Sequence, residues 1–451
     1  MRRSGGKKGI CHVVAVNMGY GHERPAHVLR HLSVNKKVVI ANDYDGIPER
    51  DKSSWEGSRS FYEKISRFKS VPVVGDFVFK WTVDEMQRIP AFYPRRDLSA
   101  PSTQLNLIYS MIRRRKWVRH LVESLAEKNP VPLLCTFMTP AFAAEEFGYP
   151  NDIYVLVTDS DMSRAWVAKD PKKSRIRYFA PTGRVAERLK LYGVPAKNVF
   201  LTGFALPTEA VGGLASKTLM KNLGRRICKL DPHGIFLNQM QSTISQSFGP
   251  RFCSNAPGKR KDSIKLAFAV GGAGAQREIG TAILRSLAAD IKRGRIEYTF
   301  VVGNRPEVKR YFEDAVKKAR LKVGKGVHLL YEETRPEYFA SFTKLVQDID
   351  ILWTKPSELS FYTGLGLPII MAPTVGSQED YNHKWLEQVG GGIDQLDPRY
   401  TNEWLFDWIN SGALAKKAWN GFIEAPTHGA YRIEDVISGR GNTIHPLPMV
   451  V

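Results

Sequence analysis

Two segments of the chain repeat one local plan: a mainly apolar run, which is rich in β-branched residues in the first copy, a glycine-rich turn and a helical stretch. The first copy has its apolar run at residues 10–16 and its turn at residues 18–22. The second copy has them at residues 264–270 and 271–276. A strand, a tight turn and a helix in this order open a βαβ unit, in which parallel strands are joined by crossover helices. The repeat therefore predicts an α/β domain in each half of the chain.

Further short apolar runs follow each copy, and stretches with helical periodicity separate them, the longest at residues 103–128. This alternation favours an α/β fold with two Rossmann-like parallel-sheet domains, whose ligand-binding edges face a shared cleft. The expected strands of the first domain lie at residues 37–41, 133–137, 153–158, 177–180 and 199–202. Those of the second lie at residues 298–302, 327–331, 349–353 and 368–372.

Domain boundaries follow from length and from a change in composition. A chain of 451 residues exceeds the roughly 100–200 residues typical of one domain. Glycine, proline and a basic run interrupt the pattern between the two halves. We predict an N-terminal domain at residues 1–205, a linker with some helix at residues 206–262, a C-terminal domain at residues 263–442 and a tail at residues 443–451.

The charge of the chain is strongly positive. Sixty-six Lys and Arg residues stand against 45 Asp and Glu residues, which gives a formal net charge of +21. Such a charge attracts polyanions, namely nucleotides, nucleic acid or an anionic membrane surface.

The chain is expected to be cytoplasmic. No stretch approaches the roughly 20 apolar residues that span a bilayer, and the apolar run after the basic N-terminus is better explained as a strand than as a signal peptide. Cys11, Cys135, Cys228 and Cys253 show no metal-binding spacing, so we expect four reduced, unpaired thiols.

The turn of the second copy is the strongest chemical signal in the sequence. Glycine lets the backbone approach a ligand closely, and a helix N-terminus offers N–H groups and partial positive charge to a phosphate. The spacing is not that of a dinucleotide site, and a tight turn without a ligand remains an alternative. The candidate residues are Gly271, Gly272, Ala273, Gly274, Ala275 and Gln276.

Two residues of the first half are candidates for acid–base chemistry. His22 lies beside two glycines after the first strand, where it could act as a general base or serve a structural role. Asp159 follows another predicted strand and is expected to be a base or a partner of His22. Asp159 and Asp161 form a DxD sequence, but because no further carboxylates accompany it we predict no metal site.

Polar residues flank the last predicted strand of the second half. They follow the run Gly364–Pro368, and their short side chains suit the hydroxyl groups of a sugar, although a solvated helix start is the alternative. The candidates are Ser377, Gln378, Glu379, Asp380 and Asn382.

Four motifs occur together in one order: a GxGH turn after the first strand, a TD at a middle strand end, a glycine-rich turn opening the second half, and a GLP–strand–Q(E/D)xxN run. In that order they resemble the lipid glycosyltransferases of the B fold (GT-B). The nearest groups are the monogalactosyldiacylglycerol synthases and the bacterial N-acetylglucosaminyltransferase that makes lipid-linked peptidoglycan precursor.

The resemblance implies a role for each motif. The amides of residues 271–276 would hold the phosphates of a UDP-sugar, the region before Gly364 would meet the ribose, and residues 378–382 would meet the donor sugar. His22 would serve the acceptor hydroxyl, with Asp159 near it. No metal or other cofactor would be required, since glycine amides and a helix end would stabilise the departing UDP.

One position departs from the pattern of this family. Its members place a ribose-binding Glu five residues before the glycine of the GLP turn, and this chain has Phe361 there. The nearest acid is Glu358, which could bind the ribose from a shifted register. Alternatively, the nucleotide is held differently, or the chain has kept the fold and lost the chemistry.

A stretch at residues 53–96 interleaves aromatic and basic side chains, and residues 113–119 form a basic run in a predicted helix. Both are typical of a membrane interface, where rings lie among headgroups and cations meet anionic lipid. Core packing with a solvated basic face is the alternative. Single-stranded nucleic acid would also fit, but no recognised motif supports it and no nucleic-acid partner is expected.

The sequence thus predicts a glycosyltransferase that moves a sugar from a UDP-sugar to a hydroxyl acceptor, with a membrane lipid as the expected acceptor. The N-terminal domain would bind the acceptor and an anionic membrane surface at the inner face, and the C-terminal domain the UDP-sugar. The alternatives are a UDP-sugar 2-epimerase of the same fold and a non-catalytic GT-B binding protein.

Overall fold

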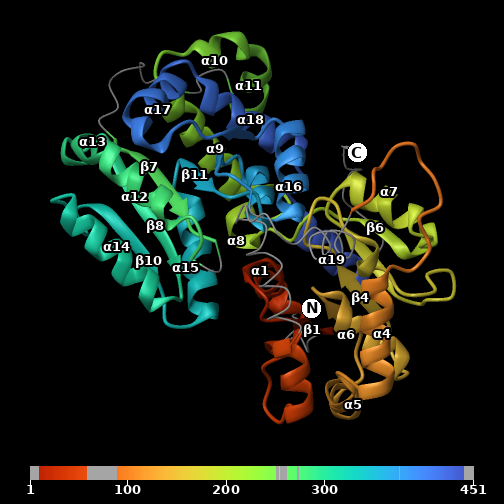
Figure 1. The fold of residues 1–451 in the computed structure, drawn as a ribbon. Coiled ribbons are helices and arrows are strands. Elements are labelled where there is room, and N and C mark those ends of the chain that lie inside the picture. Colours follow the sequence, from red (N-terminus) through yellow and green to blue (C-terminus); the bar gives the residue numbers. More distant parts are fainter. Residues whose placement is uncertain are drawn as a thin grey trace, which may run out of the picture. The chain divides into compact units, whose positions relative to one another are not determined.

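The structure is a computed structural model that describes residues 10–57, 89–249, 253, 262–271, 274–374 and 376–440. The chain forms two compact units (Figure 1). Unit 1 contains the described residues of Met1–Ala205, Val375–Tyr381 and His428–Val451, and unit 2 those of Leu206–Thr374 and Asn382–Thr427. Each unit has its own parallel sheet, so the prediction of two Rossmann-like parallel-sheet domains is confirmed.

Unit 1 is built on a six-stranded sheet in the order β2-β1-β3-β4-β5-β6, and every neighbouring pair is parallel. Its central strands are short and fully buried, as expected where helices cover both faces. The strands are β1 (Cys11–Ala15), β2 (Ser33–Ile40), β3 (Leu133–Cys135), β4 (Ile153–Leu156), β5 (Arg177–Ala180) and β6 (Val199–Leu201).

Helices cover both faces of this sheet. One apolar cluster joins the strands to α1, η1 and α19, and the other joins them to α4, α5, α6 and α7. The helices are α1 (Tyr20–Val28), η1 (Leu29–Leu32), α4 (Thr103–Arg115), α5 (Arg119–Lys128), α6 (Met138–Glu146), η2 (Arg164–Trp166), α7 (Gly183–Leu191), η3 (Ala196–Asn198) and α19 (Gly429–Ile437). The C-terminal helix α19 therefore belongs to the core of unit 1.

The helical stretch predicted at residues 103–128 is two helices. Lys116 and Val118 have φ values of 54° and 68°, in the left-handed region that ends a right-handed helix. Between them Trp117 is buried against the ring of Trp55, with centroids 4.6 Å apart. The break between the two helices lets the Trp117 side chain point into the core. In a continuous helix it would point in another direction.

Unit 2 is built on a seven-stranded parallel sheet in the order β13-β12-β11-β7-β8-β10-β9. Phe268 and Phe300 pair across β7 and β8 and face α12 and α14, whereas α15 lies on the other face beside Lys265 and Thr299. The strands are β7 (Ile264–Ala269), β8 (Ile296–Gly303), β9 (Lys322–Val323), β10 (Gly326–Tyr331), β11 (Ile351–Thr354), β12 (Ile369–Met371) and β13 (Gly392–Asp394).

The region predicted as a linker contains four helices in its described part and lies within unit 2. The amphipathic α9 buries Leu219, Leu223 and Ile227 and packs on α18 and α15. The helices of unit 2 are α8 (Thr208–Val211), α9 (Lys217–Leu230), α10 (Ile235–Gln239), α11 (Gln241–Phe248), α12 (Arg277–Ser286), α13 (Ala288–Lys292), α14 (Pro306–Lys318), α15 (Arg335–Asp348), η4 (Glu358–Leu365), η5 (Pro398–Tyr400), α17 (Thr401–Asn410) and α18 (Ala413–Glu424). The chain changes unit within α16 (Ser377–Gln388).

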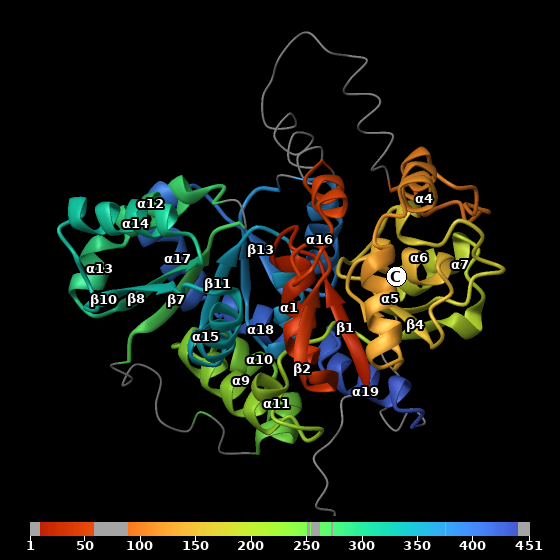
Figure 2. The same cartoon turned by 90° about the horizontal axis from the view of Figure 1, so that it is seen from below.

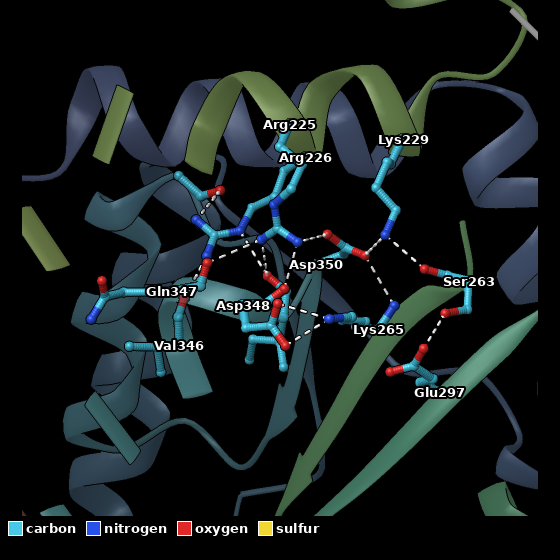
Figure 3. Close-up of polar contacts among 12 residues, drawn as sticks. Arg225, Arg226, Lys229, Ser263, Lys265, Glu297, Val346, Gln347, Asp348 and Asp350 are labelled. Carbon is cyan, nitrogen blue, oxygen red and sulfur yellow. Dashed lines mark hydrogen bonds and ion pairs between the residues drawn. The ribbon is translucent and has the colours of Figure 1, made fainter. Parts of the chain in front are cut away.

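A buried charge network fixes α9 to the start of β7 and β11 (Figure 3). The carboxylate of Asp350 lies 2.6 Å from the ammonium of Lys229 and 3.0 Å from the guanidinium of Arg225, and it accepts the backbone N–H of Lys265. Arg226 donates to the carbonyl groups of Ile349 and of three other residues. Two cations of α9, Arg225 and Lys229, thus share one fully buried carboxylate, and Arg226 between them is held by carbonyl groups.

The prediction of four unpaired thiols is wrong. Cys228 and Cys253 form a disulfide with a Cα–Cα separation of 5.6 Å, while Cys11 and Cys135 are free and buried. The spacing of cysteines along a chain does not show which of them meet in the fold. In the fold Cys228, on α9, and Cys253 lie within the usual range for a disulfide.

The predicted tail and most of the aromatic and basic stretch at residues 53–96 lie outside the described residues. Among the helices that the structure describes, none combines the length and the apolarity needed to cross a membrane.

Candidate functional site

In unit 2 the predicted phosphate-binding turn follows β7, at the carboxyl edge of the sheet where parallel α/β folds bind ligands. The N–H of Gly274 donates to the carbonyl oxygen of Gly271 at 2.7 Å and closes the turn. Gly274 has φ +70°, which glycine adopts without strain. Gly272 and Ala273 lie outside the described residues.

The turn leads into the N-terminus of α12. Gln276 has φ 64°, and its side chain donates to the carbonyl oxygen of Pro373 at 2.7 Å rather than capping the helix. No described side chain caps α12, so its first N–H groups and their partial positive charge are available to an anion. Gly280 allows α12 to approach the sheet closely, because a Cβ there would lie 2.8 Å from the ring of Phe268.

Lys355 is a residue that the sequence analysis did not select. It follows β11, which pairs with β7 so that Thr354 lies opposite Ala269. A Cβ placed on Gly271 would lie 2.9 Å from Cε and 3.6 Å from Nζ of Lys355. The lysine side chain therefore lies against the bare backbone of the turn. The sequence did offer one signal for Lys355. It is a basic residue directly after a predicted buried strand.

The departure at Phe361 has a structural explanation. Phe361 is 2% exposed and its ring lies 4.8 Å from that of Trp385, at an angle of 48°. The side chain therefore packs in the core of unit 2. Glu358 begins η4, immediately after the β11 edge, and is 9% exposed. The acid nearest to the expected ribose position thus lies one turn earlier, close in sequence to Lys355.

The candidate sugar-binding residues lie at the start of α16. Gln378 and Glu379 are partly exposed and Asp380 is exposed, and these three belong to unit 1. Asn382 belongs to unit 2 and is 1% exposed, so its amide is buried in that unit. The side chain of Ser377 lies outside the described residues.

In unit 1 the first turn of α1 holds His22 in one orientation. Nδ1 of His22 lies 3.0 Å from the carbonyl oxygen of Thr136 and 3.3 Å from the hydroxyl of Thr158. The rings of Phe137 and Trp166 flank the imidazole at 4.9 and 5.9 Å. A carbonyl oxygen only accepts, so in the neutral ring Nδ1 carries the proton and Nε2 the lone pair. This tautomer suits a general base acting through Nε2.

Asp159 follows Thr158 directly, and the Thr158 hydroxyl contacts His22. The structure therefore brings the two predicted acid–base residues to the same part of the sheet edge. Asp161 is held differently: it is fully buried and its carboxylate accepts from Arg184 at 2.7 Å and from Arg188 at 2.8 and 2.9 Å. These guanidinium groups occupy the oxygens that a DxD metal site would use.

No protein-family model matches the chain, and no curated protein matches its sequence. Solved structures that resemble it include MurG of Acinetobacter baumannii (12% identity, 95% of this chain and 99% of that chain, TM-score 0.43). They also include UDP-GlcNAc 2-epimerase from Neisseria meningitidis bound to UDP-GlcNAc (14%, 76% and 84%, TM-score 0.42) and HepE of Anabaena in complex with UDP (10%, 71% and 81%, TM-score 0.40).

The resemblance to GT-B glycosyltransferases thus recurs among solved structures, together with epimerases. With TM-scores below 0.5, these likenesses support no conclusion about the chemistry of the chain, which must follow from its own residues.

Proposed function

We propose that the chain is a metal-independent glycosyltransferase that moves a sugar from a UDP-sugar to a hydroxyl acceptor. The observation that carries this proposal is the position of Lys355 against Gly271, beside the uncapped N-terminus of α12. A bare glycine backbone, a lysine ammonium and free helix N–H groups together form a cradle for a diphosphate. The same groups would stabilise the charge that develops on UDP as it leaves the sugar.

Unit 1 would supply the general base that activates the acceptor hydroxyl. Nε2 of His22 would take the proton of the acceptor hydroxyl as that oxygen attacks the anomeric carbon and the bond to UDP breaks. The contacts of Nδ1 with Thr136 and Thr158 hold the base in the required tautomer. Asp159, next to Thr158, would favour the imidazolium that forms.

The nucleotide site is tested by two variants, one at Lys355 and one at Gly271, the two residues that meet in the cradle. We expect Lys355→Met to weaken UDP binding about 10–100-fold, because losing a hydrogen bond to a charged group costs about 1.5–3 kcal/mol. Gly271→Ala should weaken it as well, since the new methyl group would displace Lys355. Isothermal titration with UDP measures both, and Lys344→Met, on the exposed side of α15, is the control. Unchanged affinity in both variants would exclude this site.

The donor sugar can be identified by a melting screen with nucleotide-sugars. A ligand at 100 times its dissociation constant stabilises the folded state by about 2.7 kcal/mol, which is readily measured. Incubation with the selected donor alone then separates the enzyme classes: an epimerised sugar would indicate a 2-epimerase, and slow UDP release would indicate a transferase.

Phe361 favours a second candidate function, a non-catalytic binding protein that has kept the GT-B fold and lost the ribose contact. Its burial against Trp385 removes a polar group from the expected ribose position. Failure to bind any UDP-sugar in the screen, while the chain still binds anionic vesicles, would support this candidate over the enzyme.

The proposed acceptor is a membrane lipid, and the proposed location is the inner face of a membrane. Arg114, Arg115 and Lys116 are exposed at the end of α4, and the structure records no ion pair for them among the described residues. Their neighbour Arg113 is paired with Glu146 at 2.8 Å. Three adjacent exposed cations with no ion pair to a described residue suit an anionic headgroup layer.

We expect replacement of Arg114, Arg115 and Lys116 by Gln to weaken binding to phosphatidylglycerol-containing vesicles about 100-fold. Each basic residue near such a surface contributes about 1 kcal/mol, and the effect should shrink as salt is added. Vesicle co-sedimentation measures it. The matched control replaces Lys317, Lys318 and Arg320, three exposed cations of unit 2. Equal losses in the two triple variants would show a general charge effect and no membrane-binding surface.

A further inference from the structure

A histidine between two carboxylates lies in unit 2, outside the proposed diphosphate cradle. His383 and Glu387 are four residues apart on α16 and therefore share one helix face. Asp394 is the last residue of β13, at the carboxyl edge of the sheet (α16 and β13 are labelled in Figure 2). One ligand atom from each of the three residues lies within 4.8 Å of the others.

The two contacts of the imidazole differ in length and in chemistry. Nε2 of His383 lies 2.6 Å from the Asp394 carboxylate, a short charge-assisted hydrogen bond. A carboxylate only accepts, so Nε2 carries a proton, and in the neutral ring the lone pair is on Nδ1. That nitrogen lies 3.4 Å from Oε2 of Glu387. A proton or a metal ion between this nitrogen and the carboxylate oxygen would make the contact favourable.

The separation favours the metal ion. A charge-assisted N–H···O bond is about 2.7–2.9 Å long, which is shorter than the Nδ1–Oε2 distance in His383 and Glu387. Two ligands of a tetrahedral zinc ion with bonds of about 2.0–2.1 Å are about 3.3–3.4 Å apart. The Nδ1–Oε2 distance of 3.4 Å therefore matches the separation of two ligands on one such ion.

In such a site Asp394 would be the carboxylate that orients the metal-binding histidine. Histidines that bind metals usually donate their other ring N–H to a carboxylate, which fixes the tautomer and makes the ligand more basic. Backbone pairing of β13 with β12 holds Asp394 in place, since it lies opposite Met371. Glu387 is 52% and His383 22% exposed at the side chain, so an ion and its waters have access.

We propose that His383 and Glu387 bind a divalent transition-metal ion of the Zn²⁺ type, with Asp394 as the carboxylate that orients the histidine. Water would complete the coordination. This site goes beyond the proposed glycosyl transfer and does not depend on it. No metal was predicted from the sequence, and local spacing does not reveal this site because Asp394 comes from a separate element, β13.

The site has a consequence for α16. His383 directly follows Asn382, the last of the predicted sugar-binding residues. Bound metal would join the second turn of α16 to the histidine–aspartate contact at the end of β13. Zn²⁺ would then stabilise this part of unit 2, and local hydrogen exchange in α16 should slow when the ion is added.

The test is a Zn²⁺ titration of the untagged full chain, followed with a competing fluorescent chelator. We expect one saturable site that is lost in His383→Gln and in Glu387→Gln, and that is weakened about 10–100-fold in Asp394→Asn. His328→Gln is the matched control, because His328 is also exposed and lies 4.0 Å from Glu297. Circular dichroism confirms that each variant is folded.

The alternative interpretation is a protonated His383 paired with both carboxylates, which predicts no saturable Zn²⁺ binding. That result, or a site that persists in His383→Gln, would overturn the proposal. Unchanged affinity in Asp394→Asn would overturn the role given to Asp394. Because the titration contains no nucleotide, its outcome is separate from that of the UDP-binding experiments.

Discussion

We expect Asp350→Asn to destabilise unit 2 by about 3–5 kcal/mol, the usual cost of removing one partner from a buried ion pair. Asp350 is fully buried and is the carboxylate nearest to Arg225 and Lys229, at 3.0 and 2.6 Å. An amide keeps the shape of the side chain but leaves these cations without a counter-charge. Desolvation of the unpaired charges, more than the lost hydrogen bonds, sets the size of the effect.

A third cation raises the effect further. Burial, and next the neighbouring Arg225, lowers the pKa of Arg226 to about 9, while Asp350 acts in the opposite direction. The guanidinium of Arg226 has only carbonyl groups as hydrogen-bond partners in the described structure. Removing Asp350 therefore also removes the nearest compensation for a fully buried positive charge (Figure 3).

Asp348 provides the matched control. It lies two residues before Asp350, pairs with Lys265 at 2.7 Å, and is 60% exposed. Exposed pairs contribute about 0–1 kcal/mol, so Asp348→Asn should change stability little. Adding Lys229→Met to Asp350→Asn should restore part of the loss, because one unpaired cation is removed. Calorimetry measures the change, and hydrogen exchange in α9 and β11 assigns it to unit 2. Equal losses for Asp348→Asn and Asp350→Asn would contradict this account.

The elements with strong periodicity could be predicted from sequence. The mainly apolar runs before each glycine turn are β1 and β7, and β5 has the predicted bounds Arg177–Ala180. These segments are apolar on both faces because helices cover both sides of a parallel sheet, and that pattern is local. The two-residue β9 and the three-residue β13 carry too little pattern to be recognised, since partner strands hold them in place.

Features set by contacts between distant residues could not be predicted. Lys116 and Val118 adopt left-handed conformations because Trp117 packs on Trp55, 62 positions earlier in the chain. The disulfide of Cys228 depends on Cys253, which lies 25 positions later in the chain. In each case the deciding partner is absent from the local sequence window.

The sequence predicted what kind of site this is, but it did not predict all of the residues that form it. Glycines before a helix predict a phosphate cradle from local chemistry. Lys355 joins that cradle only because β11 pairs with β7, which is a property of strand order. Phe361 was noticed as a departure, but its burial against Trp385 follows from how α16 packs and not from the motif itself.

We expect His22→Gln to reduce sugar transfer about 10²–10⁴-fold, the usual contribution of a general base. Glutamine fills a similar volume and its amide can still donate to the Thr136 carbonyl, so the surrounding contacts are retained. What it lacks is the basic lone pair at Nε2 that would accept the acceptor proton. The measurement is UDP release from the donor identified by the melting screen, with a total lipid extract as the source of acceptor.

The prediction separates catalysis from binding, because His22 belongs to unit 1 and the proposed diphosphate cradle to unit 2. UDP affinity in His22→Gln should equal that of the unmodified chain, so the loss should appear in kcat. His31→Gln is the control, since His31 is 41% exposed and pairs with Glu434 at the surface of the same unit. Full activity in His22→Gln would show that His22 is not the general base. A loss confined to UDP affinity would place His22 in donor binding, because a general base that acts on the acceptor makes no contribution to holding the nucleotide.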